Sequence, residues 1–204
     1  LAVLVFFKYY GFLLNTIGGI IGIHIPHPEL SLPIGLSFYT FRNLSYLFDI
    51  YLCKVSAQRN FLTFAVYSTM FPYTSAGPIV RYTDIETQLK QRTINIFKFG
   101  IGAELFVKGL AKKVLLADNL SVLYSSICGH PQMSVFTSWL GILAYTMQLY
   151  FDFSGYSDMA IGLGKMFGFE FLENFNYPYI SRSVTEFWRR WHMTLMDWLK
   201  NYVY

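Results

Sequence analysis

The sequence predicts an all-α fold, a polytopic integral membrane bundle of helices with one re-entrant segment and one interfacial helix. Only 14% of the 204 residues are charged, whereas soluble domains carry about 25%. Hydrophobic residues make up 54% of the chain, and 20% of the residues are aromatic. A water-soluble fold of this size has too little interior for that much apolar surface, so the lipid bilayer is the expected solvent.

The charged and sulfur-containing residues exclude several classes of function. The net charge of +4 comes from scattered side chains with no basic run, which argues against nucleic acid as a partner. Cys53 and Cys128 have no neighbouring Cys or His at metal-ligand spacing. We therefore expect no metal site, no tightly bound cofactor and two cysteines that serve as apolar filler.

Two apolar windows open the chain, each long enough for a membrane helix. Leu1–Ile23 lacks a basic start and a cleavage site, so it indicates a membrane helix and not a signal peptide. Leu32–Cys53 forms the second window. His24 and His27 lie in the loop between them.

The third window, Asn60–Val80, has no charged residue but is interrupted by Pro72, Gly77 and Pro78. A continuous helix is therefore not expected. Basic residues flank both ends, which conflicts with a single crossing under the positive-inside tendency. We favour a re-entrant segment whose two ends lie on the cytoplasmic side.

The remaining windows predict a helical second half. Ile94–Leu116 is amphipathic, since Glu104, Lys108 and Lys112 recur every four residues. From Asn119 to near His130 we expect a loop, followed by a spanning helix over Ser134–Phe151. A separate helix over Ser154–Phe169 would pack closely through small residues at four-residue intervals: Ala160, Gly164 and Gly168. Residues 1–204 show no repeat or linker and form a single membrane-embedded unit.

Buried ionisable residues are the first functional candidates, because charge is costly in lipid. Arg42 and Asp49 are seven residues apart and share one helix face, for which we favour structural pairing over a cavity lining. Asp152 and Asp158 are six residues apart and point to different faces, so a shared proton would require a break near Gly155. We favour polar anchoring of neighbouring helices, and we keep both aspartates as candidates for substrate or donor binding.

The segment from Phe187 to Trp198 is the richest in the chain and predicts one interfacial helix. Its apolar face consists of Trp188, Trp191, Leu195 and Trp198. Its polar face consists of Arg190, Thr194 and Asp197. Four side chains are candidates for binding a phosphate, a thioester carrier or an anionic lipid: Trp188, Arg189, Trp191 and Arg190.

His192 lies between these two faces, beside Trp188 and Leu195, and is the catalytic candidate. An imidazole can exchange a proton near neutral pH, although a lone histidine on an apolar face is commonly a structural residue. His130, like the two early histidines, is expected in a loop.

Four blocks resemble the membrane-bound O-acyltransferases, within them the bacterial branch that acetylates alginate and other cell-surface polysaccharides. The blocks are Pro33–Phe41, Ala76–Tyr82, Gln148–Gly162 and Phe187–Leu195. The resemblance implies a multi-helix enzyme of the bacterial inner membrane. Its acyl donor would be acetyl-CoA or a carrier-bound thioester on the cytoplasmic side. Its acceptor would be an extracytoplasmic polysaccharide, reached through a partner acetyltransferase subunit.

The resemblance also assigns roles to residues. His192 matches the first polar position of the active site, while the principal catalytic histidine of the family lies downstream of these 204 residues. The chain therefore resembles part of a larger domain truncated at both ends, and we expect it to be inactive alone. Relatives commonly have Arg-Asp-Tyr where this chain has Lys200, Asn201 and Tyr202.

Two other classes of function fit the composition. A transporter or lipid scramblase would also bury the four charged residues Arg42, Asp49, Asp152 and Asp158. A non-catalytic scaffold subunit would only bind partners. The four blocks favour the acyltransferase, in which Arg189, Arg190 or a histidine N–H would stabilise the charge developing on the thioester carbonyl.

Overall fold

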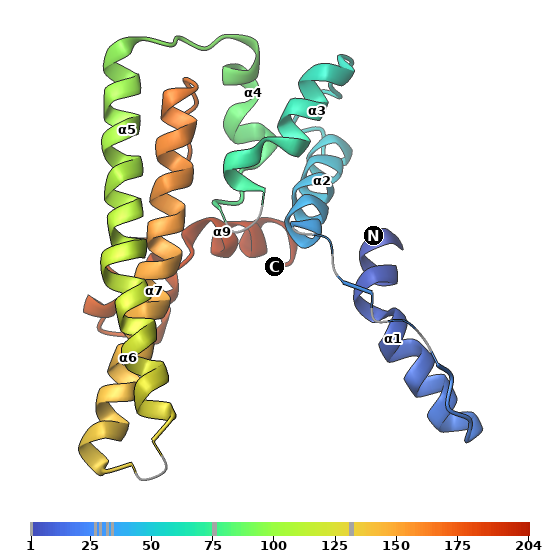
Figure 1. The fold of residues 1–204 in the computed structure, drawn as a ribbon. Coiled ribbons are helices and arrows are strands. Elements are labelled where there is room, and N and C mark those ends of the chain that lie inside the picture. Colours follow the sequence, from blue (N-terminus) through green and yellow to red (C-terminus); the bar gives the residue numbers. More distant parts are fainter. Residues whose placement is uncertain are drawn as a thin grey trace.

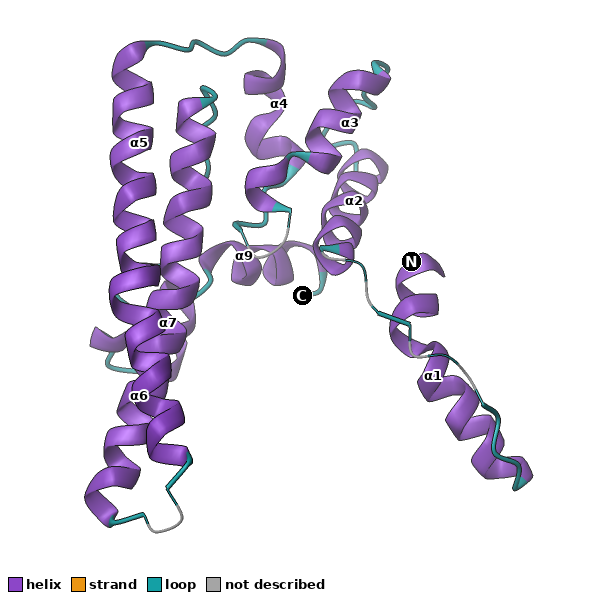
Figure 2. Cartoon of the chain, viewed as in Figure 1, coloured by secondary structure: helices purple, strands orange, loops and turns teal. Residues whose placement is uncertain are grey.

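The computed structural model describes residues 2–26, 28, 30–31, 33, 35–74, 77–130 and 133–204. Within these residues all regular secondary structure is helical, apart from one isolated antiparallel bridge between Phe175 and Trp191, as Figure 2 shows. The predicted all-α class is confirmed. His27 lies outside the described residues, whereas His24 and His130 lie in loops as expected.

Apart from α1, the helices form two groups, which are joined by the loop between α4 and α5 and by the C-terminal segment (Figure 1). Helix α7 runs antiparallel to α5 and α6, and α2, α3 and α4 form the second group, with α9 lying across one end of it. The helices are α1 Ala2–Ile21, α2 Leu36–Tyr51, α3 Phe61–Thr69, α4 Tyr82–Lys90, α5 Ile96–Ala111, α6 Asp118–Cys128, α7 Val135–Met166, α8 Val184–Arg190 and α9 Met193–Tyr202. Shorter turns are η1 Phe71–Tyr73, the π-helix η2 Lys112–Ala117, and η3 Pro178–Ile180.

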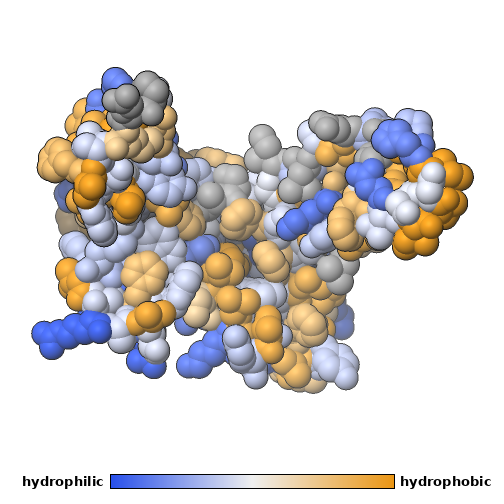
Figure 3. Space-filling model, turned by 90° about the horizontal axis from the view of Figure 1, so that it is seen from below, coloured by the Kyte–Doolittle hydropathy of each residue, from blue (hydrophilic) through white to orange (hydrophobic). Residues whose placement is uncertain are grey.

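Helix α1 stands at the edge of the molecule and presents its apolar side chains outward. Of its 20 residues only Gly18 is buried. It is also the one helix among the described residues that is both long and apolar enough to cross a membrane. Helix α2, in the second predicted window, has only 16 residues. The space-filling view in Figure 3 shows hydrophobic side chains spread over this face of the molecule, most densely towards one end.

The second half of the chain is more helical than predicted. Residues 118–128 form α6 and not a loop, and α6 continues from α5 through the π-helical turn η2. Helix α7 runs unbroken for 32 residues, so the two predicted helices over 134–151 and 154–169 are one. No proline interrupts this stretch, and Gly155 is accommodated because α5 packs directly on it.

Glycines set the spacing between α5 and α7. A Cβ atom on Gly109 would lie 2.5 Å from the carbonyl oxygen of Gly155, and one on Gly102 would lie 2.6 Å from that of Gly162. Close packing through small residues is confirmed, but the glycines differ from the predicted ones. Gly164 faces the Phe171 ring, and Gly168 follows the end of α7 with a φ of 79°.

The core of the second group is built around buried tyrosines and Arg42. Arg42 is 2% exposed and donates to the carbonyl oxygens of Ser68 at 2.7 Å and Tyr73 at 2.8 Å. Its guanidinium also lies 4.1 Å from the centre of the Tyr73 ring. The predicted pairing of Arg42 with Asp49 is therefore wrong, because carbonyl groups freed at the end of α3 take up the guanidinium.

The segment over 60–80 is broken as predicted, since α3 ends at Thr69 and only the short turn η1 follows. Its re-entry into a membrane stays a prediction. Ser75 and Ala76 lie outside the described residues. The two cysteines, Cys53 and Cys128, are both free and exposed, and their role as apolar filler stays a prediction.

Candidate functional site

The turn between α8 and α9 carries the catalytic candidate. His192 has φ 47° and ψ 53°, a left-handed conformation, so the single interfacial helix predicted over 187–198 is wrong. Trp191 leaves the helical path because it forms the antiparallel bridge with Phe175, and the amide of Asn176 donates to the carbonyl of Arg190 at 2.9 Å. Left-handed backbone at a bulky residue is costly and is retained only where the surroundings fix it.

Asn174 fixes this turn by contacting three consecutive residues. Its side-chain oxygen lies 2.9 Å from Nδ1 of His192 and accepts hydrogen bonds from the amide and the hydroxyl of Thr194, at 3.3 and 3.0 Å. Its backbone oxygen accepts from the amide of Met193 at 3.0 Å. Asn174 is 1% exposed and was not among the predicted site residues. Because the contacts join different parts of the chain, no local pattern in the sequence indicates them.

The first half of the chain reaches this site through the buried segment after η1. The amide of Ile79 donates to the hydroxyl of Thr194 at 3.0 Å, over a separation of 115 residues. Ile79 and Thr194 are 5% and 4% exposed. Two of the four sequence blocks, over 76–82 and 187–195, therefore meet at one buried hydrogen bond.

His192 is held as a neutral imidazole. It is 8% exposed, and the Phe153 ring packs edge-on against it at 4.9 Å. Burial lowers the pKa of His192 to about 4. The turn lies between helices of 7 and 10 residues, both too short to span a bilayer. The imidazole thus contacts Asn174 and Phe153, neither of which was predicted beside it.

The two arginines on α8 have different environments. Arg190 pairs with Glu186 at 3.0 Å and donates to the carbonyl of Asn176 at 3.2 Å. Arg189 has no ion pair or hydrogen bond within the described part of the chain. Arg190 therefore has a structural role, whereas Arg189 is free to meet a ligand.

The two tryptophans differ in the same way. Trp191 packs in an aromatic cluster, stacked on Phe187 at 5.6 Å and edge-on to Phe175 at 5.1 Å. Trp188 is 44% exposed and, together with Arg189, lines a cavity of about 550 Å³ between α8 and α9. The rest of the lining combines apolar and charged side chains: Thr185, Met193, Met196, Asp197, Leu199, Lys200 and Tyr204.

Asp152 and Asp158 anchor α7 to the helix beside it, which is the interpretation the sequence favoured. Asp152 lies 2.6 Å from Lys113, and Asp158 lies 2.6 Å from Lys112. The lysines are consecutive residues of the π-helical turn η2, a kind of irregularity frequent at functional sites. Because α7 is continuous, the two carboxylates do not share a proton. Asp158 also lines a second cavity, of about 340 Å³, to which Asn174 contributes.

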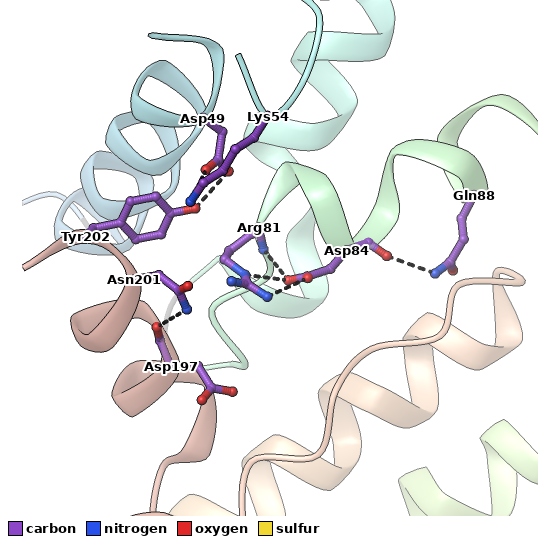
Figure 4. Close-up of polar contacts among 8 residues, drawn as sticks. All are labelled: Asp49, Lys54, Arg81, Asp84, Gln88, Asp197, Asn201 and Tyr202. Carbon is purple, nitrogen blue, oxygen red and sulfur yellow. Dashed lines mark hydrogen bonds and ion pairs between the residues drawn. The ribbon is translucent and has the colours of Figure 1, made fainter. Parts of the chain in front are cut away.

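Figure 4 shows a further polar cluster where α9 meets α2 and α4. Arg81 forms a bidentate pair with Asp84, with nitrogen-to-oxygen distances of 2.9 and 3.2 Å. Asp197 on α9 lies on the other side of Arg81 without a direct hydrogen bond. In the same cluster Tyr202 of α9 donates to Asp49 of α2, which ties α9 to the rest of the molecule. No cluster of three or more His, Cys, Asp or Glu side chains that could hold a metal ion occurs among the described residues.

Comparison with known proteins gives consistent results. The sequence model of MBOAT, the membrane-bound O-acyltransferase family, matches residues 54–204. The chain is 48% identical over its whole length to a protein of Pseudomonas aeruginosa called probable alginate O-acetylase AlgI, and covers 40% of that protein. It is 35% identical over 98% of its length to the peptidoglycan O-acetyltransferase of Helicobacter pylori, covering 43% of it. It is 28% identical over 89% of its length to the teichoic acid D-alanyltransferase of Bacillus subtilis, covering 47% of it. The chain thus spans less than half the length of these relatives.

Proposed function

The chain belongs to the membrane-bound O-acyltransferase family, and from that premise we propose that the protein transfers an acyl group, most simply acetyl, from a thioester to a polysaccharide hydroxyl. The observation that carries the proposal is His192, a buried neutral imidazole that Asn174 fixes directly before Met193. Met193 lines the cavity between α8 and α9 together with Trp188 and Arg189. The names of the three relatives agree on acyl transfer to a cell-surface polymer.

The cavity between α8 and α9 suits the donor. Its apolar lining, which includes Met193 and Met196, fits an acyl or pantetheine-like chain, while Arg189 and Lys200 can hold phosphate oxygens. We assign this cavity to acetyl-CoA or to a carrier-bound thioester. His192, directly before α9, then positions the reacting groups beside the thioester, and the principal base is expected elsewhere in the complete protein.

The proposed setting is the bacterial inner membrane, crossed several times, with transfer to an extracytoplasmic polysaccharide through a partner acetyltransferase subunit. The basic residues Lys54 and Arg59 favour a cytoplasmic position of the adjoining loop under the positive-inside tendency. Cys53 lies in this loop and is exposed, which makes it a natural reporter of topology. In intact cells, Cys53 should resist a membrane-impermeant maleimide and react after permeabilisation, where the labelling of Cys53 is defined as the part lost in a C53S variant. Labelling in intact cells would reverse the proposed orientation.

The activity itself is tested with the complete protein in membranes, using radiolabelled acetyl-CoA, a carrier-bound acetyl thioester and isolated polysaccharides as acceptors. We expect His192→Gln to lower transfer by about 10²-fold or more while the protein remains folded, because positioned imidazoles contribute about 10²- to 10⁴-fold in rate. Unchanged transfer by this variant would remove His192 from the mechanism. Transfer by neither donor to any acceptor would overturn the proposed activity.

A further inference from the structure

We infer that Asn174 is a positioning residue that sets the tautomer of His192, leaving Nε2 as the unprotonated nitrogen that faces the reaction. The catalytic role of this tautomer rests on the proposed function, whereas the tautomer itself follows from the hydrogen-bond geometry. It concerns a residue 18 positions before the histidine, outside the segment that the sequence identified as functional.

The tautomer follows from the other partners of the asparagine. A backbone amide can only donate, so the Asn174 side-chain atom that meets the amide of Thr194 is the carbonyl oxygen and not the NH2 group. The same oxygen lies 2.9 Å from Nδ1 of His192. An oxygen of this kind has no hydrogen to give, so Nδ1 carries the proton and Nε2 keeps its lone pair.

The asparagine cannot easily turn over to reverse this assignment. Its oxygen accepts from two groups of Thr194, whose hydroxyl accepts in turn from the amide of Ile79. Its backbone oxygen is bound by the amide of Met193. A flipped amide would set NH2 against the backbone N–H of Thr194 and would lose the hydrogen bond from that amide. The chain of hydrogen bonds from residue 79 to residue 192 therefore holds one tautomer.

The NH2 group of Asn174 provides independent support. This nitrogen is buried and has no hydrogen-bond partner among the described residues. A buried donor without a partner is unfavourable and calls for an explanation beyond packing. A carboxylate would satisfy the same donors without the orphan group, but it would also favour imidazolium. An amide oxygen accepts from Nδ1 and leaves the ring neutral. The ring must be neutral if Nε2 is to accept a hydrogen bond or a proton.

The charged groups around the turn do not already control the imidazole. Burial is the cause of the lowered pKa of His192, with no charged neighbour among its causes. None of the charged side chains on the elements around the turn forms a hydrogen bond or ion pair with the ring within the described residues. These side chains are Arg81, Asp152, Asp158, Lys165, Glu170, Glu173, Glu186, Arg189, Arg190, Asp197 and Lys200. A carboxylate introduced at residue 174 would thus be the first charge in direct contact with the ring.

The decisive variant is Asn174→Asp in the complete protein. It replaces an NH2 group that has no partner, so it removes no hydrogen bond of the described structure and should fold. The carboxylate should raise the pKa of His192 by about 1 to 3 and move the acid limb of the pH–rate profile to higher pH by the same amount. Asn176→Asp is the matched control: it makes the same change two residues away, at an exposed side chain without a bond to His192, and should leave the limb in place.

A second measurement keeps the inference independent of activity. Ring ¹⁵N shifts of histidine-labelled protein, assigned by comparison with His192→Gln, should show Nδ1 protonated and Nε2 unprotonated at pH 7. A proton on Nε2, or equal shifts of the pH limb in the two Asn→Asp variants, would overturn the role of Asn174. If the wild-type protein transfers no acyl group, the proposed function fails, whereas the ¹⁵N shifts still decide the tautomer.

Discussion

The hydroxyl of Tyr202 donates a 2.7 Å hydrogen bond to the carboxylate of Asp49, across 153 residues of sequence. Asp49 is 1% exposed, and its other oxygen lies 3.8 Å from the Lys54 ammonium. This contact ties the last turn of α9 to the end of α2 (Figure 4). It therefore helps to hold in place the helix that begins at His192.

Removal of this hydroxyl should destabilise the fold. We expect Tyr202→Phe to lower the free energy of unfolding by about 1.5–3 kcal/mol, because a buried carboxylate loses the hydrogen bond from the Tyr202 hydroxyl. The measurement is denaturant unfolding in a fixed detergent. Tyr51→Phe is the control, since Tyr51 is 83% exposed, and it should change stability by less than about 0.5 kcal/mol. Equal effects of the two variants would show that the bond to Asp49 contributes nothing.

The packing of α5 on α7 predicts opposite effects for two glycines on one helix. In Gly102→Ala the new Cβ would lie 2.6 Å from the carbonyl oxygen of Gly162, so the helices must separate at a cost of about 1–3 kcal/mol. In Gly100→Ala the Cβ meets nothing within 4 Å, and the loss of glycine freedom in a helix should stabilise by about 0.5–1 kcal/mol. Thermal unfolding of both variants checks the prediction, and destabilisation by Gly100→Ala would contradict it.

The helices and the site differed in how far the sequence could predict them. Composition and periodicity were sufficient for the all-α class, for the break in the segment over 60–80 and for the anchoring role of Asp152 and Asp158, because these depend on local pattern and charge. The break at His192 was missed, since the segment 187–198 has no glycine or proline and reads as a continuous amphipathic helix. Its cause is the pairing of Trp191 with Phe175, a contact that no local pattern contains.

Arg42 is a second case in which a local sequence pattern did not identify the contact that forms. A spacing of seven residues placed Arg42 and Asp49 on one helix face, which made an ion pair the simplest prediction. In the structure Arg42 donates to the carbonyls of Ser68 and Tyr73, and Asp49 accepts from the hydroxyl of Tyr202. Helical spacing identifies which side chains share a face, whereas the choice of partner depends on neighbouring elements that compete for the same groups.

The buried imidazole predicts a loss of stability in acid. The pKa of His192 is lowered from 6.5 to about 4 in the folded protein, so the unfolded chain binds the proton more tightly. The contribution of His192 is therefore complete above about pH 6.5 and falls as the pH drops towards 4. Below about pH 4 it changes no further. The total loss is about 3 kcal/mol at most.

Unfolding temperatures measured between pH 4 and 8, for the wild type and His192→Gln, check this expectation. Glutamine can still donate to Asn174 but does not titrate in this range, so the variant should show a flatter pH dependence below pH 6.5. Parallel curves for the two proteins would place the acid sensitivity at other groups and contradict the buried neutral state of His192.

Substitutions of the two adjacent arginines of α8 should affect different properties, one the stability of the fold and the other the binding of the donor. Arg190 pairs with Glu186 and the carbonyl of Asn176, so Arg190→Ala should lower the unfolding temperature. Arg189 lines the cavity assigned to the donor and has no partner within the described residues, so Arg189→Ala should leave that temperature nearly unchanged. It should instead raise KM for the thioester about 10- to 100-fold, the size expected for one lost charge-assisted hydrogen bond of about 1.5–3 kcal/mol. Steady-state kinetics of the complete protein at several donor concentrations make the comparison. An unchanged KM in Arg189→Ala would move the phosphate of the donor away from α8, because no other cation of that helix is free to bind it.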